Sequence, residues 1–350
     1  MHSIIDFSDY VCGPETPISE VLRRIDSSPQ LFQMIVDPDG RLLGTVTDGD
    51  IRRAMLSGSS LDDIASCAMY TDPVTGRVGH EIENRSKLMN LGSTRSFLPL
   101  LDDAGKVCEI LFSGEVEGIT SALVMAGGLG TRLGERTKNT PKPLLKVGGR
   151  PILEHVLSSL EDVGVKNILI SVNYLAEKIE SYVGGRDNRA TIGFIHEENR
   201  LGTAGALGLI DKTFLSMPLL VVNGDLITSV DYRALFEYHQ RNNYDGTVTV
   251  ARYDVEVPFG VIRRTEDDAF DGIDEKPTIS SFIAAGIYFL SPEFQALVPR
   301  NQAVEMPDLL NMGKQIGLKI GLFPIHEYWT DVGNPHDLDA ADQSVITSSN

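Results

Sequence analysis

The C-terminal two thirds of the chain alternates short apolar runs with amphipathic stretches. The apolar runs SALVMA, NILISV, LLVVNGD, GTVTVA and FIAAGIYFL begin at residues 121, 167, 219, 246 and 282. Stretches of helical period lie between them, for example residues 151–163. Strands that alternate with helices predict βαβ units in a mostly parallel sheet. Ligands of such sheets bind at the carboxyl ends of the strands, so the functional residues are expected there.

The N-terminal part of the chain is internally repeated. VDPDGRLLGTVTDGD at residues 36–50 aligns without gaps on LDDAGKVCEILFSGE at residues 101–115, an offset of 65 residues. Each copy reads as an apolar strand end, an Asp/Gly turn, a second strand and a polar loop that opens a helix. A helical stretch precedes each copy, as residues 18–25 do for the first. The repeat predicts two small α+β units that pack on each other as a pseudo-twofold pair.

Composition narrows the function classes. The 350 residues suffice for two domains, and 42% apolar with 23% charged residues is ordinary for globular proteins. The net charge of −18 argues against duplex DNA, RNA or an anionic membrane as the main partner. An anionic ligand must therefore be held by a local cluster of cations. No apolar run is long enough to cross a bilayer, so no membrane partner is expected.

The cysteines and the first residues bear on the compartment. Cys12, Cys67 and Cys108 are an odd number without CxxC spacing, which fits neither a disulfide framework nor a thiolate zinc site. The first ten residues lack the basic and apolar segments of a secretory signal. A cytoplasmic location is the expectation.

A glycine-rich loop follows the first apolar run, within LVMAGGLGTRLGERTKNTPKPLL from residue 123. Glycines directly after a buried strand present backbone N–H groups to an anion and let the chain approach phosphate oxygens closely. The loop is not the dinucleotide fingerprint, because Leu133 stands where the third glycine would be, and no Walker A lysine follows. Arg132 and Lys142 add two cations of different geometry. This segment predicts a phosphate site.

Two aspartates predict a magnesium site. Asp225 ends the apolar strand LLVVNGD, which places its carboxylate at the ligand-binding edge of the sheet, and Asp331 offers a second oxygen ligand from far along the chain. Mg²⁺ is commonly held by one or two carboxylates together with substrate phosphates and waters. The alternative is that either aspartate only caps a turn.

The glycine-rich segment also carries a family resemblance. GGxGTRLxxxTxxxPKPLLxVxGRPIL resembles the signature of sugar-phosphate nucleotidyltransferases, which join a sugar 1-phosphate to an NTP and release pyrophosphate. The similarity continues through LGTAGAL, VVNGD, PFGVI, DEKP, AAGIYFL and FPIHEYWTDVGNPHDL. It covers essentially all of residues 120–350, which it predicts to be one Rossmann-like, GT-A-like domain with a mostly parallel sheet.

The resemblance implies roles for individual residues. Catalysis would fall to Arg132, Lys142, Asp225, Lys276 and Asp331, with Mg²⁺ on Asp225 and Asp331. The nucleotide would contact Ala126, Gly127, Gly128, Gly130, Thr131, Arg132, Lys142, Glu197, Gly202, Thr203 and Asp225. The sugar phosphate would contact Gly260, Glu275, Lys276 and Gly286. Ala284 stands where a frequent family form has Asn, which leaves the identity of the sugar open.

The expected reaction is in-line attack by a phosphate oxygen of the sugar 1-phosphate on the α-phosphorus of the NTP. The nucleophile is already an anion, so no general base is needed and positioning and charge neutralisation carry the catalysis. Glu197 lies in the segment that meets the base in this family, and a carboxylate matches the paired N–H donors of guanine. GTP is therefore favoured. The alternatives are that Glu197 and its neighbour Glu198 face solvent, or that cytosine donates to one of them.

The N-terminal repeat, with TDGDIRRAM after its second strand, resembles a tandem CBS-domain pair, a module that binds adenine or guanine nucleotides. Residues 1–119 would form this pair. Thr47, Asp48 and Asp50 keep the family's signature in the first copy, whereas Ser113, Gly114 and Glu115 depart from it in the second. One regulatory nucleotide site is expected. The alternative is that Asp48 and Asp50 only cap the helix that starts near Ile51.

The combination of the two domains resembles the CBS-containing guanylyltransferases of bacterial legionaminic acid pathways, which activate glucosamine 1-phosphate. A homo-oligomer is expected. Three alternatives stay open from the sequence. The enzyme could be a uridylyl-, cytidylyl- or thymidylyltransferase acting on another sugar, the whole chain could be an inactive nucleotide sensor, or the N-terminal pair could be only an oligomerisation scaffold.

Overall fold

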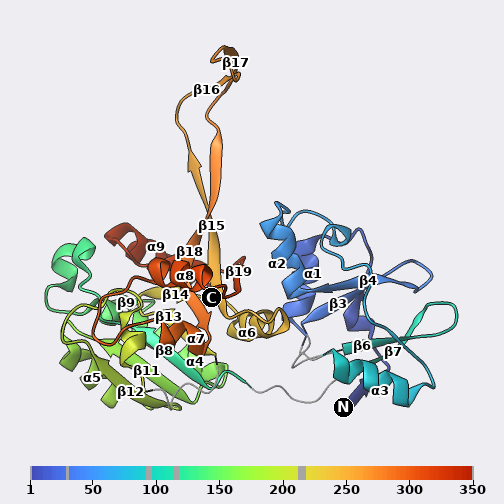
Figure 1. The fold of residues 1–350 in the computed structure, drawn as a ribbon, viewed down its shortest axis with the longest axis horizontal. Helices are drawn as coiled ribbons and strands as arrows, with labels where there is room; N and C mark the ends of the chain where they lie inside the picture. Colours follow the sequence, from blue (N-terminus) through green and yellow to red (C-terminus); the bar gives the residue numbers. More distant parts are fainter. Residues whose placement is uncertain (1, 29–30, 92–96, 113–117, 212–217, 349–350) are drawn as a thin grey trace.

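The computed structural model describes residues 2–28, 31–91, 97–112, 118–211 and 218–348. These residues form an N-terminal α/β body, a larger C-terminal α/β body and a long two-stranded arm that projects from the larger one (Figure 1). The alternation of strands and helices expected after residue 120 is confirmed.

Two small sheets carry the N-terminal repeat. The first has the order β2-β3-β4 and the second the order β1-β7-β6-β5. Helices α1 (Ile18–Asp26), α2 (Asp48–Leu56) and α3 (Glu81–Asn90) accompany them. The strands are β1 (His2–Ile4), β2 (Val11–Cys12), β3 (Phe32–Val36), β4 (Leu42–Thr47), β5 (Gly76–Arg77), β6 (Phe97–Leu101) and β7 (Val107–Phe112).

The structure preserves the 65-residue offset in strand register. Strand β3 pairs with β4 from Phe32 opposite Thr47, and β6 pairs with β7 from Phe97 opposite Phe112. Both hairpins have an irregularity at the same repeat position. The equivalent residues Phe32 and Phe97 stack on each other with ring centroids 3.6 Å apart, which places them at the junction of the two copies. The second-copy loop of Ser113, Gly114 and Glu115 lies outside the described residues.

A seven-stranded sheet forms the centre of the C-terminal body, in the order β12-β11-β8-β13-β18-β15-β19. Its strands are β8 (Ser121–Met125), β11 (Asn167–Val172), β12 (Thr191–His196), β13 (Leu219–Asn223), β15 (Gly246–Glu256), β18 (Thr278–Leu290) and β19 (Ile320–Pro324). Neighbours are parallel except where β18 runs antiparallel to β13 and β15. The expected mostly parallel sheet is confirmed.

Alternate side chains of the central strands feed two separate cores. Ala122 and Val124 of β8 point into the core that α4, α5 and α6 cover, whereas Leu123 points into the core under α7 and α8. The sheet is therefore apolar on both faces, as its uninterrupted apolar runs require. These helices are α4 (Ile152–Asp162), α5 (Ala176–Gly184), α6 (Tyr232–Arg241), α7 (Pro292–Ala296) and α8 (Met306–Gln315).

Two short strand pairs and a last helix complete this body. Strand β9 (Lys146–Val147) pairs with β10 (Arg150–Pro151), and β14 (Leu226–Thr228) pairs with β20 (Trp329–Asp331). Helix α9 (Pro335–Ser348) packs beside them, with Leu338 and Ala341 buried against Val147 and Val332.

The arm is a finding that the sequence did not predict. Strands β15 and β18 continue as an exposed ribbon past residues 251 and 282, where the apolar runs were expected to stop and start. A second hairpin of β16 (Val261–Arg264) and β17 (Phe270–Asp274) forms its tip (Figure 1). Strand pairing extends the ribbon although its side chains are not buried.

Helix α2 joins the two bodies. Arg52 is 1% exposed and donates to Asp48 at 2.6 Å, to Glu327 at 2.8 Å and to the carbonyl of Pro324. Its guanidinium lies 3.6 Å from the centroid of the Phe323 ring. Arg52, which belongs to the N-terminal body, is thus completely buried against the C-terminal body.

None of the helices in the described ranges is long and apolar enough to cross a membrane. The three cysteines are free thiols.

Candidate active site

The glycine-rich loop leaves the end of β8 and is fixed by the neighbouring strands. The amide of Ala126 donates to the carbonyl of Ser171, and the amide of Gly224 donates to that of Met125. Gly130 has a φ of 63°, and a Cβ there would lie 2.9 Å from the side chain of Thr137. The left-handed turn and this close approach both require glycine.

The two aspartates are brought together by strand pairing. Asp225 follows β13, and in the β14–β20 pair Leu226 lies opposite Asp331. The amide of Val332 also donates to the carbonyl of Asp225 at 3.1 Å. Residues from distant parts of the chain therefore place two carboxylates side by side at the carboxyl end of the sheet, as the metal prediction requires.

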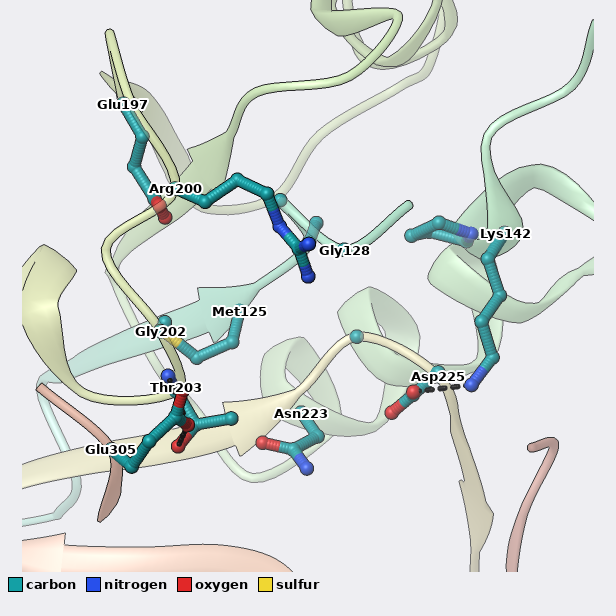
Figure 2. A pocket seen from close by; sticks show the side chains of 14 residues that line it. Met125, Gly128, Lys142, Glu197, Arg200, Gly202, Thr203, Asn223, Asp225 and Glu305 are labelled. Carbon is teal, nitrogen blue, oxygen red and sulfur yellow. Dashed lines mark hydrogen bonds and ion pairs between the residues drawn. The ribbon is translucent and has the colours of Figure 1, made fainter. Parts of the chain in front are cut away.

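Lys142 lies between these carboxylates. Its ammonium is 2.5 Å from Asp225 and 3.4 Å from Asp331, and its side chain is 8% exposed (Figure 2). Burial and the charge of Asp225 raise the pKa of Asp331, although Lys142 opposes the shift. The residues concentrate negative charge that a cation relieves.

The donor set fits a divalent cation that also binds phosphate. Asp225 Oδ1 is buried and has no hydrogen-bond partner in the described structure, so it retains free ligand capacity. No group of three or more His, Cys, Asp or Glu residues that could hold a metal occurs among the described residues. Two carboxylates completed by substrate phosphates and water are the arrangement typical of Mg²⁺.

A pocket of about 330 Å³ opens beside this pair. Eight of the predicted nucleotide residues line it: Ala126, Gly127, Gly128, Lys142, Glu197, Gly202, Thr203 and Asp225. In Figure 2, Lys142 and Asp225 lie at one end and Glu197 and Glu305 at the other. The pocket therefore offers cations and metal ligands at one end and carboxylates for a base at the other.

Glu197 is held firmly at its end of the pocket. It is 7% exposed, and its carboxylate accepts from the hydroxyl of Ser171 and, at 3.0 Å, from the amide of Leu201. The alternative that the two glutamates face solvent is wrong for Glu197, whereas Glu198 is exposed. Each carboxylate oxygen has two lone pairs, so it can accept a second hydrogen bond, from an N–H group of a nucleobase.

Three predicted nucleotide residues lie beside the pocket rather than on its lining. Gly130 and Thr131 open a 3-10 turn over Thr131–Thr137, and Thr131 is exposed. The Arg132 guanidinium lies near Gly333, just after Asp331, and its charge lowers the pKa of that aspartate against the larger raising effects. Arg132 is thus near the two aspartates that are proposed as metal ligands.

The sequence reasoning missed two charged residues of the pocket. Arg200 reaches over the centre of the pocket in Figure 2, and Glu305 accepts from the amide and hydroxyl of Thr203 at 3.1 and 2.7 Å. Arg200 stands three residues after Glu197, so a search of that segment for cations would have found it. Glu305 precedes α8 and has no local signal.

The predicted sugar residues are not all brought together. Gly286 has a φ of 77°. A Cβ there would lie 2.6 Å from the side-chain nitrogen Nδ2 of Asn223, a residue that lines the pocket. Gly260, Glu275 and Lys276 instead lie on the projecting arm, and none of them lines the pocket. Within a single chain in this conformation, the predicted nucleotide residues of the pocket are separate from the predicted sugar residues of the arm.

A second cavity, of about 320 Å³, lies in the N-terminal body. Thr47 and Asp50 line it with Arg53 and Tyr70, and Arg241 of α6 reaches it from the C-terminal body. Thr47 and Asp50 also form a capping box at the start of α2, so of the two aspartates in the capping alternative, Asp50 does cap the helix. Asp48 does not line this cavity; it is 6% exposed and pairs with Arg52.

Known proteins resemble both parts of the chain. The nucleotidyl transferase family matches residues 121–348, and the CBS domain family matches residues 6–57, the first of the two N-terminal copies.

Curated relatives carry consistent names. A mannose-1-phosphate guanylyltransferase catalytic subunit beta from Drosophila pseudoobscura pseudoobscura is 32% identical over 226 residues, 62% of this chain and 60% of the relative. A mannose-1-phosphate guanyltransferase from Pichia angusta is 34% identical over 227 residues, 61% of each chain. The chain thus spans about three fifths of the length of these relatives.

A solved structure is similar as well. HddC from Yersinia pseudotuberculosis, complexed with GMP-PN, superposes with a TM-score of 0.51 at 26% identity. The match covers 65% of this chain and all of that one.

Proposed function

Because the chain belongs to the nucleotidyl transferase family, we propose that it joins an NTP to a sugar 1-phosphate and releases pyrophosphate. The observation that carries this proposal is the meeting of Asp225, Asp331 and Lys142 at one end of a pocket whose wall is the glycine-rich loop. That arrangement suits a triphosphate and a cation better than any other ligand class.

The chain's own residues would act by positioning and charge. Loop amides around Gly128 orient the triphosphate, while Lys142 and Arg200 offset its negative charge. Asp225 and Asp331 would hold Mg²⁺, which supplies further neutralisation of phosphate charge when bound. No side chain is needed to take a proton from the attacking phosphate oxygen, because that oxygen is already an anion.

GTP is the proposed nucleotide. The guanylyltransferase names of the relatives and the guanine nucleotide in the HddC complex support this choice. Glu197 and Glu305 supply acceptors for the N–H donors of guanine at the end of the pocket away from Lys142. Uracil and thymine offer only one such donor.

Two sources bear on the sugar 1-phosphate. The sequence resemblance favours glucosamine 1-phosphate and a role in legionaminic acid synthesis, whereas the names of the relatives point to mannose 1-phosphate. We therefore place both at the head of the substrates to be tested.

For the N-terminal third of the chain we propose a regulatory role, in a protein of the cytoplasm. Residues 1–119 would form the CBS pair and residues 120–350 the transferase. A nucleotide in the cavity beside Asp50 and Arg53 would be in reach of both bodies, because Arg241 also lines it. Burial of Arg52 against Glu327 supports transmission of that binding to the transferase.

The deciding assay measures pyrophosphate release with Mg²⁺. ATP, GTP, CTP, UTP and dTTP are each combined with glucosamine, mannose, glucose and N-acetylglucosamine 1-phosphates. Turnover with GTP and one sugar is expected. Turnover with another NTP alone would overturn the guanine proposal and keep the transferase, whereas nucleotide binding without any turnover would favour a sensor.

A further inference from the structure

The arm carries part of the predicted site away from the pocket of its own chain. Strands β15 and β18 stay paired from Gly246 opposite Leu290 to Glu256 opposite Thr278. Gly286 lies beside the pocket residue Asn223, and Thr278 is eight residues earlier, roughly 27 Å away at about 3.4 Å per residue. Glu275 and Lys276 lie still farther along the arm, between the end of β17 and the start of β18.

One face of the ribbon is apolar and exposed. Val255 is paired with Ile279, and Tyr253 shares their face, with exposures of 48%, 56% and 55%. The opposite face carries Arg252, Asp254 and Glu256, with Phe282 as the partner of Arg252. Nine large apolar side chains of the arm are exposed: Tyr253, Val255, Phe259, Val261, Ile262, Phe270, Ile273, Ile279 and Phe282. Because a two-stranded ribbon is only marginally stable alone in water, such a face is expected to be covered by a partner.

Residues 257–260 and 275–277 form the joint between the ribbon and its tip, and this joint presents polar groups to a ligand. The amide of Val257 donates to the carbonyl of Pro277, and a Cβ on Gly260 would lie 3.0 Å from Glu275 Oε2. Lys276 has a φ of 47°, a strained conformation for a residue other than glycine. Across the described part of the chain, neither Glu275 nor Lys276 has a hydrogen-bond or ion-pair partner. The joint thus presents a carboxylate for hydroxyl groups and an ammonium for a phosphate.

We propose that the arm docks on a second copy of this chain, where Gly260, Glu275 and Lys276 complete the active site by holding the sugar 1-phosphate. This inference rests on the proposed transferase function. A second copy is the partner because the joint complements a nucleotide pocket with a carboxylate pair, which each copy carries and which its own arm does not reach. Two copies that exchange identical arms form a closed twofold dimer.

The pocket that would receive the partner's arm is accessible from the side of Asp331 and Tyr328. The side chain of Asp331 is 41% exposed, and Tyr328, three residues earlier, is 42% exposed. An arm from the partner that covers Tyr328 with its apolar face would bring Lys276 towards the metal end of the pocket. There its ammonium would meet the phosphate of the sugar.

Mixed dimers test the exchange of arms. Asp225→Asn and Lys276→Ala chains with different tags are co-expressed at full length, and dimers that carry both tags are purified. Each variant alone should lose at least about a hundredfold in pyrophosphate release. In the mixed dimer, the intact pocket of one chain receives the intact arm of the other, so about half of the wild-type activity should return. Mixed dimers no more active than the better parent would overturn the proposal.

Sedimentation equilibrium gives a readout that does not depend on catalysis. The wild type should be a dimer, and the double variant Val255→Ser with Ile279→Ser should raise the dimer Kd at least about tenfold. Glu256→Gln, on the polar face of the same ribbon, should leave it unchanged. A monomeric wild type, or a dimer indifferent to the double variant, would overturn the docking. A wild-type dimer that responds to the double variant yet turns over no substrate pair would overturn the transferase function instead.

Discussion

Arg52 of the N-terminal body and Glu327 of the C-terminal body form an ion pair of 2.8 Å in the interior of the protein. Burial raises the pKa of Glu327, but the charge and the hydrogen bond of Arg52, together with the charge of His326, outweigh burial and lower that pKa. Glu327 lies four residues before Asp331. The contact therefore ties the predicted regulatory domain to the segment that supplies one of the two proposed metal ligands.

Replacing Arg52 should strongly destabilise the protein. Arg52→Met leaves Asp48 and Glu327 buried without their counter-ion, which should lower the free energy of unfolding by about 3–5 kcal/mol. Urea denaturation followed by fluorescence of Trp329 measures the loss. Arg53→Met is the matched control, because this side chain is 45% exposed and should contribute less than about 1 kcal/mol. Equal losses in the two variants would contradict the prediction.

Asp225 should be essential for turnover but not for folding. Asp225→Asn keeps the size of the side chain and removes a charge from the metal end of the pocket, so kcat/KM should fall at least about a hundredfold. Calorimetric titration of the GTP-loaded protein with Mg²⁺ should show weaker binding of the metal. Asp339→Asn is the control, since this exposed aspartate pairs only with Arg136 at 3.0 Å in the described structure. Full activity in Asp225→Asn would remove the basis of the proposed mechanism.

The buried His239 should make stability depend on pH. Burial lowers its pKa to about 4, and its ring lies 2.9 Å from the hydroxyl of Thr247. An unfolded histidine titrates near about 6.5, so between these values the unfolded chain binds a proton that the folded one does not. The stabilisation is complete above pH 6.5 and falls as the pH drops towards 4, by up to about 1.4 kcal/mol per unit.

His239→Gln isolates this contribution. The difference in unfolding free energy between the variant and the wild type should change with pH over that range and be constant above it. His336→Gln, at a side chain that is 93% exposed, should show no such trend. A pH-independent difference for His239→Gln would argue against a neutral buried imidazole.

A nucleotide should stabilise the N-terminal body. AMP, ADP, GMP and GDP are added separately, and the shift in Tm is measured by scanning calorimetry. At a hundredfold excess over its Kd, a bound nucleotide contributes about 2.7 kcal/mol. Asp50→Asn should weaken the shift, because Asp50 lines the cavity, while the exposed Asp62→Asn should not. A protein indifferent to all four nucleotides would favour the scaffold alternative.

Local structure could be predicted from the sequence alone. Apolar runs are set by neighbours in the chain, and Asn167–Val172 is a strand over the residues expected for it. The helix expected at residues 151–163 is observed at Ile152–Asp162. The repeat was also readable, because its 65-residue offset reappears in the strand register. The glycine-rich loop and Asp225 could be placed at the sheet edge for the same reason.

Only the tertiary structure decided which distant residues meet. Asp331 reaches Asp225 through the β14–β20 pair, and Glu305 reaches Thr203, which lies 102 residues earlier in the chain. No local pattern in the sequence marks Arg52 as buried, yet packing against Phe323 buries it. The arm separates Lys276 from the pocket because strand pairing continues beyond the last buried residues. Such contacts depend on how whole elements pack. Because the packing energy is distributed over the chain, no local sequence pattern predicts them.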